Sequence, residues 1–254
     1  MTLHNASMTY HPYHTFGESR SGRWCVTCDH ATNTVPPSIN GGTLGLPPAD
    51  MARHIAWDPG AAGLALGLAD QLDSPAICSN FSRLVIDPNR GEDDPTLLMK
   101  LYDGTIIPGN RTADAAEIAR RKALCYHPYH TALAALLKTR PKPVLLSVHS
   151  FTPKLKGRSP RPWEIGVLHS WRDPALAEAL ITRLRREGDL TVGDNEPYGG
   201  HLPGDSVDRH ALAKGRPNVL IELRQDLIAT DEQQAAWAAR LAPILAEVLE
   251  ESGL

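Results

Sequence analysis

The sequence predicts an α/β domain with a largely parallel sheet covered by helices on both faces. Short apolar runs alternate along the chain with longer runs of helical periodicity, which is typical of parallel strands joined by helices. Three of the short runs end on His or acidic residues, and ligands of α/β sheets usually bind where strands end. With 254 residues, 42% of them hydrophobic, the chain is long enough for one large domain with a substantial core.

We expect residues 1–20, which are polar and contain several histidines, to form a flexible tail, and residues 21–254 to form a single domain. Strand-like runs are predicted at 24–28, 76–87, 144–149, 163–169, 190–193 and 219–223. Helix-like runs are predicted at 61–72, 113–137, 174–187 and 232–251. Asp58 and Asp173 each precede a proline, and Asp231 precedes the last apolar-periodic run, so all three are expected to cap helices.

The overall charge excludes several classes of partner. A formal net charge of −3 provides no general attraction to nucleic acid or to anionic membranes. The sequence contains no apolar stretch of membrane-spanning length and no apolar signal-peptide core near its start, so a cytoplasmic location is expected.

Cys25 and Cys28 lie three residues apart in a strand-like run and should point to opposite faces. We interpret them as buried structural cysteines, with a redox pair as the alternative.

Two histidines and a glutamate follow strand-like runs and together suggest an open zinc site. His30 follows the run 24–28, His149 ends the run 144–149, and Glu222 follows the apolar residues of the last run. A hydrolytic zinc site needs three protein ligands and one open position. The third ligand is ambiguous: Asp58 is a better donor type than Asn33, because an amide is a poor zinc ligand, although a helix cap explains Asp58 almost as well.

Glu222 is predicted to act as the catalytic base, since a charged residue on a central strand is rare without a partner. The alternative is an ion pair with Arg224, which shares its face of the strand. Asn89 and Arg90 could clamp a substrate carboxylate, because Arg offers a bidentate fork. The second Asn-Arg pair at 110–111 shows that this dipeptide also occurs by chance.

Other polar residues are weaker candidates. Asn195 and Tyr198 lie in a turn-forming strand exit and could donate hydrogen bonds to the substrate, although turn structure alone explains most of this segment. No role is assigned to a further group of residues: His54, Arg83, His169, His201 and His210.

Several segments, in order, resemble the N-formylglutamate amidohydrolase family, itself similar to the zinc carboxypeptidase and aspartoacylase group. The resemblance covers about residues 24–228. It rests on Cys28-Asp-His-Ala-Thr-Asn33, His54-Ile-Ala-Trp-Asp58, Ser82-Arg-Leu-Val-Ile-Asp-Pro-Asn-Arg90, Asp103-Gly-Thr-Ile-Ile-Pro-Gly-Asn110, and the segments 126–130, 148–151, 193–198 and 221–227.

This resemblance implies a zinc-carboxypeptidase-like fold: a three-layer α/β/α sandwich around a mixed sheet, with one Zn²⁺ per chain. His30 and His149 match the metal histidines, Glu222 matches the general base, and Asn89-Arg90 matches the substrate-carboxylate clamp. The wider group often has Glu three residues after its first metal histidine. Asn33 stands at that position here, and Asp58 is our replacement.

The implied reaction is hydrolysis of a small acidic N-acyl amino acid. For N-formyl-L-glutamate the products are formate and glutamate, the end of one route of histidine breakdown. Two alternatives remain: a carboxypeptidase-like amidase acting on peptides or cell-wall fragments, and a metal-free member that binds a small acid without activity.

Overall fold

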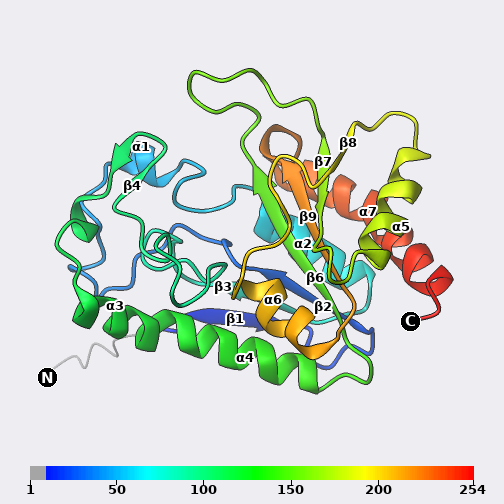
Figure 1. The fold of residues 1–254 in the computed structure, drawn as a ribbon, viewed down its shortest axis with the longest axis horizontal. Helices are drawn as coiled ribbons and strands as arrows, with labels where there is room; N and C mark the ends of the chain where they lie inside the picture. The colour runs from blue at the N-terminus through cyan, green and yellow to red at the C-terminus, as the bar shows by residue number, and fades with distance from the viewer. Residues whose placement is uncertain (1–9) are drawn as a thin grey trace, which may run out of the picture.

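A seven-stranded mixed sheet forms the middle layer of the computed structural model, which describes residues 10–254 (Figure 1). The strand order is β1-β3-β2-β6-β9-β7-β8. The strands are β1 (Tyr13–Phe16), β2 (Trp24–Cys28), β3 (Ala76–Ser79), β6 (Val144–Phe151), β7 (Ile165–Leu168), β8 (Val192–Asp194) and β9 (Asn218–Arg224). Strands β3, β2, β6 and β9 are parallel, whereas β1 and the pair β7–β8 run the other way.

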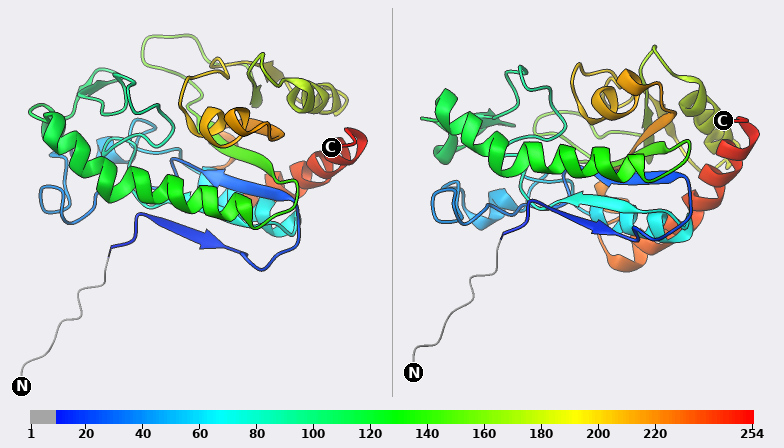
Figure 2. Two further views of the ribbon diagram at one scale, coloured as in Figure 1. Left: turned by 60° about the horizontal axis from the view of Figure 1, so that its bottom comes forward. Right: turned by 90° about the horizontal axis from the view of Figure 1, so that it is seen from below.

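Helices cover both faces of this sheet (Figure 2). Helices α2 (Ala61–Gln71), α5 (Ala175–Arg185) and α7 (Asp231–Glu251) pack on one face, where they share a core with alternate strand residues such as Val26 and Leu146. Helices α4 (His127–Lys138) and α6 (Ser206–His210) lie on the other face with Cys25 and Leu145. The alternation follows from the two-residue period of a strand. The predicted three-layer fold with a mixed sheet is confirmed.

Smaller elements lie beside the main sheet. Helix α1 (Pro48–Met51), helix α3 (Ala115–Arg121) and a two-stranded sheet of β4 (Leu101–Tyr102) and β5 (Thr105–Ile106) form an irregular flank (Figure 1). Short 3₁₀ turns occur at η1 (Pro108–Asn110), η3 (Leu212–Lys214) and η4 (Gln225–Leu227). Among residues 10–254, no helix combines the length and the apolar character needed to cross a membrane.

The strand predicted at 76–87 is wrong beyond Ser79. The segment that follows is irregular, and its backbone bonds to loops instead of to a strand: Ser82 donates its N–H to Thr34 O, and Arg83 donates to Ala56 O. The segment carries Arg83 and Asp87, two charged side chains that are buried together. Such a pair needs mutual contact, but residues four apart in a straight strand lie about 13 Å from each other.

The single helix predicted at 113–137 is interrupted. Helix α3 ends at Arg121, a π-helical turn, η2, follows (Lys122–Tyr126), and α4 begins at His127. Pro128 lies in the first turn of α4. It has no N–H to continue the α-helical hydrogen bonds and its ring crowds the preceding turn, so a wider turn absorbs the mismatch.

The three predicted aspartate caps are also wrong. The N-cap of α2 is Gly60, and the Asp58 side chain does not cap it. Pro174 takes the N-cap position of α5 in place of Asp173. Thr230, and not Asp231, caps α7, in a capping box with Gln233. Asp58 cannot cap α2 because its carboxylate is engaged by two histidines.

The predicted flexible tail is corrected in part. Residues Tyr13–Phe16 form the edge strand β1, antiparallel to β3. Their alternating half-buried and exposed side chains fit a strand with one covered face. The part of the tail prediction that concerns residues 1–9 lies outside the described residues.

The cysteines are structural, as predicted. Cys25 and Cys28 belong to the cores on opposite faces of the sheet. All four cysteines are buried free thiols, and burial raises the pKa of Cys25 to about 12. A thiol with so high a pKa is a poor nucleophile and a poor redox partner.

A buried arginine holds the irregular segment between β3 and α3 in place. Arg121 is completely buried. Its guanidinium donates to Val85 O (2.9 Å), to Asn110 Oδ1 (2.7 Å) and to Gly109 O (3.1 Å). Its Nε also donates to Glu117 Oε1 at 2.7 Å. These contacts satisfy backbone carbonyls that have no strand or helix to pair with.

We expect Arg121→Met to lower the free energy of unfolding by about 3–5 kcal/mol, because the carbonyls and Glu117 lose their buried partner. Arg120→Met is the matched control, since Arg120 pairs with the same Glu117 but is exposed, and its loss should cost about 1 kcal/mol or less. Urea unfolding followed by circular dichroism measures both. Equal effects of the two substitutions would contradict this role of Arg121.

Candidate active site

Parallel strands bring the three residues of the predicted zinc site to one edge of the sheet. Strands β2, β6 and β9 are parallel neighbours, so their carboxyl ends lie together. His30 follows β2, while His149 and Glu222 face each other in the β6–β9 register. All three side chains are buried. The structure therefore brings together residues that are up to 192 positions apart in the chain (222 − 30).

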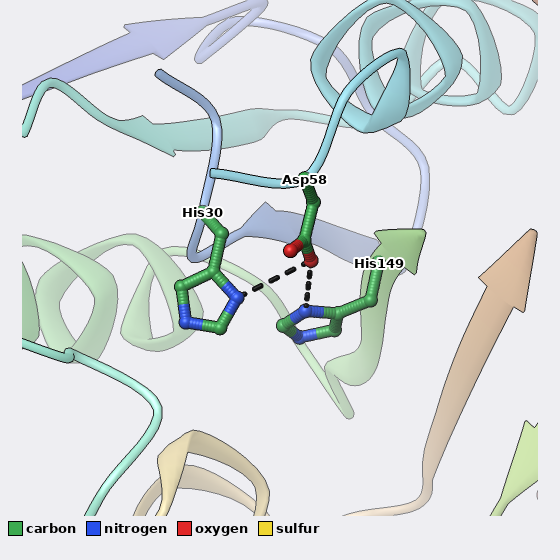
Figure 3. Close-up of side chains that lie close together, drawn as sticks. All are labelled: His30, Asp58 and His149. Atoms are coloured by element: carbon green, nitrogen blue, oxygen red, sulfur yellow. Dashed lines mark hydrogen bonds and ion pairs between the residues drawn. The ribbon is translucent and has the colours of Figure 1, made fainter. Parts of the chain in front are cut away.

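Asp58 lies between the two imidazoles (Figure 3). Its Oδ2 is 3.2 Å from His30 Nδ1 and 2.9 Å from His149 Nδ1. The loop that carries Asp58 is tied to the first histidine, because Asp58 donates its N–H to His30 O at 2.9 Å. The carboxylate favoured as third ligand thus lies next to both histidines.

The Nε2 atom of each imidazole also has polar neighbours. His30 Nε2 lies 2.7 Å from Asp87 Oδ1, a carboxylate that can only accept, so this nitrogen carries the hydrogen. His149 Nε2 lies 3.1 Å from Ser147 Oγ and 3.8 Å from Asp29 Oδ2. Contacts of this kind fix the ring orientation and leave Nδ1 free to bind a cation.

The donor set fits a divalent metal ion. The ligand atoms of His30, Asp58 and His149 all lie within 4.8 Å of one another. Bonds of about 2.0–2.1 Å in a tetrahedral zinc site separate the ligand atoms by roughly 3.3 Å, close to the two distances from Asp58. Both Nδ1 atoms face the same Asp58 oxygen, so positive charge at this point is favoured, whether from protons on the rings or from a metal ion. These residues could together hold a metal ion.

The pKa values of His149 and Asp58 also show that positive charge is favoured within the triad. Burial alone would lower the pKa of His149, but its hydrogen bond to Asp58 and the charges of Asp58, Glu222 and Asp29 raise that pKa to about 9. Burial would raise the pKa of Asp58, yet the two histidines hold it well below its usual range. A proton on His149 thus supplies positive charge where the donor atoms converge.

Arg83 and Asp87 complete a buried ionic network that the sequence analysis did not assign. Arg83 donates to Asp87 Oδ2 at 2.9 Å and to Asp58 Oδ1 at 3.4 Å. Asp87 also accepts from the backbone N–H of Asn89 at 2.9 Å. The available signal was a pair of opposite charges four residues apart, in which Asp87 is the first residue of the segment Asp-Pro-Asn-Arg. In this network Arg83 holds Asp58 through its Oδ1, and Asp87 orients the His30 ring through Nε2.

Asp29 is a second supporting residue that sequence reasoning passed over. It is buried and accepts a hydrogen bond from the Tyr129 hydroxyl of α4. Its other oxygen, Oδ2, has no hydrogen-bond partner among residues 10–254 and faces His149 Nε2. Tyr129 therefore links the helix layer to one of the two histidines.

Glu222 is a buried carboxyl group with a free oxygen. Its Oε2 finds no hydrogen-bond partner in the described part of the chain. Burial raises the pKa of Glu222 to about 7, although the nearby His149 opposes that rise. Such a group can exchange a proton near neutral pH, which is the property required of a general base.

Arg224 is not the ion-pair partner of Glu222, and its predicted contact with substrate stays a prediction. Its guanidinium is held by Asp226 at 2.8 Å and by Glu164 at 3.4 Å. It does not line the cavity that contains Glu222. The two residues share a strand face as predicted, but carboxylates beyond the strand end compete successfully for the arginine.

The triad and Glu222 open into one cavity of about 320 Å³. Asn89, Arg90, Tyr198 and His54 also line it. Arg90 uses its Nε on Thr96 Oγ1 and one terminal nitrogen on Asn89 O, which leaves its other terminal nitrogen without a protein partner among residues 10–254. A carboxylate in the cavity could bind there.

Asn195 has a structural role, and its predicted contact with substrate stays a prediction. It lies outside the cavity lining, and its Oδ1 accepts from the backbone N–H groups of His169 and Gly200. The chain comes so close here that a Cβ on Gly200 would lie 2.1 Å from His169 N. Asn195 thereby supports the loop that presents Tyr198 to the cavity.

The remaining candidates lie away from the triad. Asn33 donates to Met51 O at 2.8 Å and does not line the cavity, so the structure does not support it as an alternative third ligand. Of the unassigned histidines, only His54 lines the cavity. His169 contacts Asp194, His201 contacts Ser170, and His210 stacks on His130.

Comparisons with known proteins show the family to which this chain belongs. Residues 22–229 match the sequence profile of the family described as N-formylglutamate amidohydrolase. An N-formylglutamate deformylase from Pseudomonas aeruginosa is 29% identical over 250 residues, covering 89% of each chain. Among solved structures, a gene product from Agrobacterium tumefaciens has 35% identity and a TM-score of 0.90, covering 96% of this chain and 97% of that one.

An N-formylglutamate amidohydrolase from Ralstonia eutropha shares the fold, with a TM-score of 0.76, 21% identity and coverage of 96% of this chain and 99% of that one. The resemblance inferred from short sequence segments is therefore confirmed over most of the chain. This chain belongs to the N-formylglutamate amidohydrolase family of hydrolases.

Proposed function

We propose that this protein hydrolyses N-formyl-L-glutamate, or a similar N-acyl amino acid, to the free amino acid and formate or the corresponding acid. One observation carries the proposal: a buried glutamate with a free oxygen shares a cavity with two histidines and an aspartate whose ligand atoms converge. Family membership and the deformylase relative support the substrate class. The family resemblance further supports a cytoplasmic role at the end of histidine breakdown.

His30, Asp58 and His149 would hold a single zinc ion. When bound, zinc supplies a Lewis acid that polarises the amide carbonyl and lowers the pKa of a water in the cavity. Asn33, which stands where the wider group often has Glu, lies outside the cavity and does not count against this set.

Glu222 would move the proton. It accepts a proton from the attacking water as the C–O bond forms, and it delivers that proton to the amide nitrogen as the C–N bond breaks. A carboxyl group with a pKa of about 7 can do both near neutral pH. Arg90 and Asn89 would bind a substrate carboxylate, which places the acyl group over the triad.

We predict that chelation removes about one zinc ion per chain together with activity, and that added zinc restores both. His30→Asn should lose the metal, because it removes one of three ligands. His54→Asn is the matched control: His54 lines the same cavity without joining the triad, so its zinc content should stay near that of the unmutated protein. Elemental analysis measures the zinc. Full zinc content in His30→Asn would overturn the ligand set.

Glu222→Gln should reduce kcat by about 10²–10⁴-fold, because an amide cannot accept the water's proton. Its zinc content should remain near that of the unmutated protein. Steady-state kinetics with N-formyl-L-glutamate and elemental analysis test the two parts. Loss of zinc in this variant would make Glu222 a ligand instead of a base.

Arg90→Met should raise KM for N-formyl-L-glutamate by about 10–100-fold, since a hydrogen bond to a charged group is lost. The matched control is Arg111→Met, in the second Asn-Arg pair, which is exposed and outside the cavity lining. Its KM should not change. An unchanged KM in Arg90→Met would remove Arg90 from the substrate clamp.

A further inference from the structure

A groove of about 530 Å³ is lined by residues of α4, α6 and η3. The two helices lie side by side on one face of the sheet (Figures 1 and 2). None of the residues that line this groove also lines the catalytic cavity, so the two spaces are separate. In the described part of the chain the lining contains no acidic residue, but it contains six basic ones: His127, His130, Lys138, Arg209, His210 and Lys214.

Two lysines give the groove positive charge that the protein does not neutralise. His127 and Arg209 each lie 3.4 Å from a carboxylate oxygen of Glu92. Lys138 and Lys214 are exposed, and neither forms an ion pair with the described residues. The groove therefore keeps an excess of positive charge, which attracts anions.

Two buried histidines at the groove form an ordered chain of hydrogen bonds. His130 Nε2 lies 3.0 Å from Pro88 O, a carbonyl that can only accept, so this nitrogen carries the hydrogen. His130 Nδ1 lies 2.9 Å from His210 Nε2. Because a neutral imidazole has one donor and one acceptor nitrogen, His130 Nδ1 accepts and His210 Nε2 donates. The same rule leaves His210 Nδ1 without a hydrogen, as an acceptor.

Both rings are uncharged near neutral pH, as this order requires. Burial lowers the pKa of His130 to about 2 and that of His210 to about 4. The positive charges of Arg209, Arg216 and Lys214 also lower the pKa of His210. His210 therefore offers a lone pair, and not a positive charge, to whatever lies in the groove.

His210 Nδ1 is open to the groove. The His210 side chain lines it, although the residue is only 4% exposed. Its Nδ1 forms no hydrogen bond with the described residues, whereas its Nε2 is engaged by His130. The fully enclosed polar atoms without a partner all belong to other residues, so a ligand in the groove can reach this nitrogen. A group that donates a hydrogen bond is favoured there.

We propose that this groove binds a small oxyanion that keeps a hydroxyl hydrogen, such as hydrogen phosphate or bicarbonate. The hydroxyl donates to His210 Nδ1, and Lys138 and Lys214 attract the charged oxygens. Sulfate is also a small anion, but it has no hydrogen and would present a lone pair to the lone pair of His210. The lysines thus supply attraction for anions, and the neutral histidine supplies selection among them. This second site is separate from the proposed hydrolysis.

The test titrates the unmutated protein with hydrogen phosphate, bicarbonate and sulfate at pH 8. Hydrogen phosphate and sulfate have the same charge at this pH and differ in one hydrogen. The ring nitrogens of His130 and His210 are followed by NMR in histidine-labelled protein, so the readout reports on the groove itself. Hydrogen phosphate or bicarbonate should shift the His210 Nδ1 signal and bind at least about tenfold more tightly than sulfate, because sulfate cannot make this hydrogen bond.

Whichever of the two hydroxyl-bearing anions binds more tightly is identified as the ligand. Equal affinity for sulfate, or no shift with any of the three anions, would overturn the proposal. Arg90→Met should leave the titration unchanged. Loss of the response in that variant would place the anion in the catalytic cavity instead and would count equally against the groove.

His210→Gln tests the accepting nitrogen. The amide of Gln can still donate to His130 Nδ1, but it offers no acceptor in place of His210 Nδ1. The preference for hydrogen phosphate over sulfate should disappear, as measured on the His130 ring. A preserved preference would reject the role of His210. The comparison of the two anions in the unmutated protein decides the proposal even if this variant does not fold.

A pair of double variants tests the charge. Lys138→Gln with Lys214→Gln should weaken binding of hydrogen phosphate about fivefold, since two exposed attractions are lost. Lys154→Gln with Lys156→Gln is the matched control, because these lysines are also exposed and line neither the groove nor the catalytic cavity. Binding should be unaffected in the control. An equal loss in both double variants would show an effect of overall charge and would refute a site at the groove.

Discussion

The contact of Asp58 with two imidazoles is the interaction on which the rest of the site depends. Three buried aspartates, Asp29, Asp58 and Asp87, surround the histidines, and Arg83 is the buried arginine beside them. Ionised groups removed from water are stable only when opposite charge lies close by. The raised pKa of His149 meets part of this demand with a proton. A divalent ion held by the same donor atoms would meet it more fully.

The sheet brings together groups from distant parts of the sequence. Parallel pairing of β2, β6 and β9 brings their carboxyl ends to one edge, and His149 and Glu222 become direct cross-strand partners. The other side of the site comes from irregular segments, because Arg83 and Asp87 must approach the histidines from outside the sheet. Regular strands and irregular loops thus contribute different parts: the strands fix relative position, and the loops fix charge and orientation.

The success of prediction from the sequence follows the same division between strands and loops. His30, His149 and Glu222 were identifiable because apolar runs end on them, and parallel strands place such ends together. Asp58 was ambiguous, since Asp before Pro is also typical of a helix cap, and only its neighbours in space distinguish the two. The contacts of Arg224 and Asn195 could not be predicted because their partners, Glu164 and the backbone of His169, belong to other segments. Periodicity also gave no sign of the break at the π-helical turn before Pro128.

The way Arg121 holds the segment between β3 and α3 has a consequence for divergence within such proteins. Its guanidinium binds the carbonyl oxygens of Val85 and Gly109, and Asn110 likewise binds those of Leu84 and Met99. Every amino acid supplies a carbonyl oxygen, so these anchors do not depend on which side chains the segment displays. Neighbouring positions that face the cavity, such as Asn89 and Arg90, can therefore mutate while the backbone of the segment keeps its conformation. Substrate specificity can thus diverge during evolution without a change of fold.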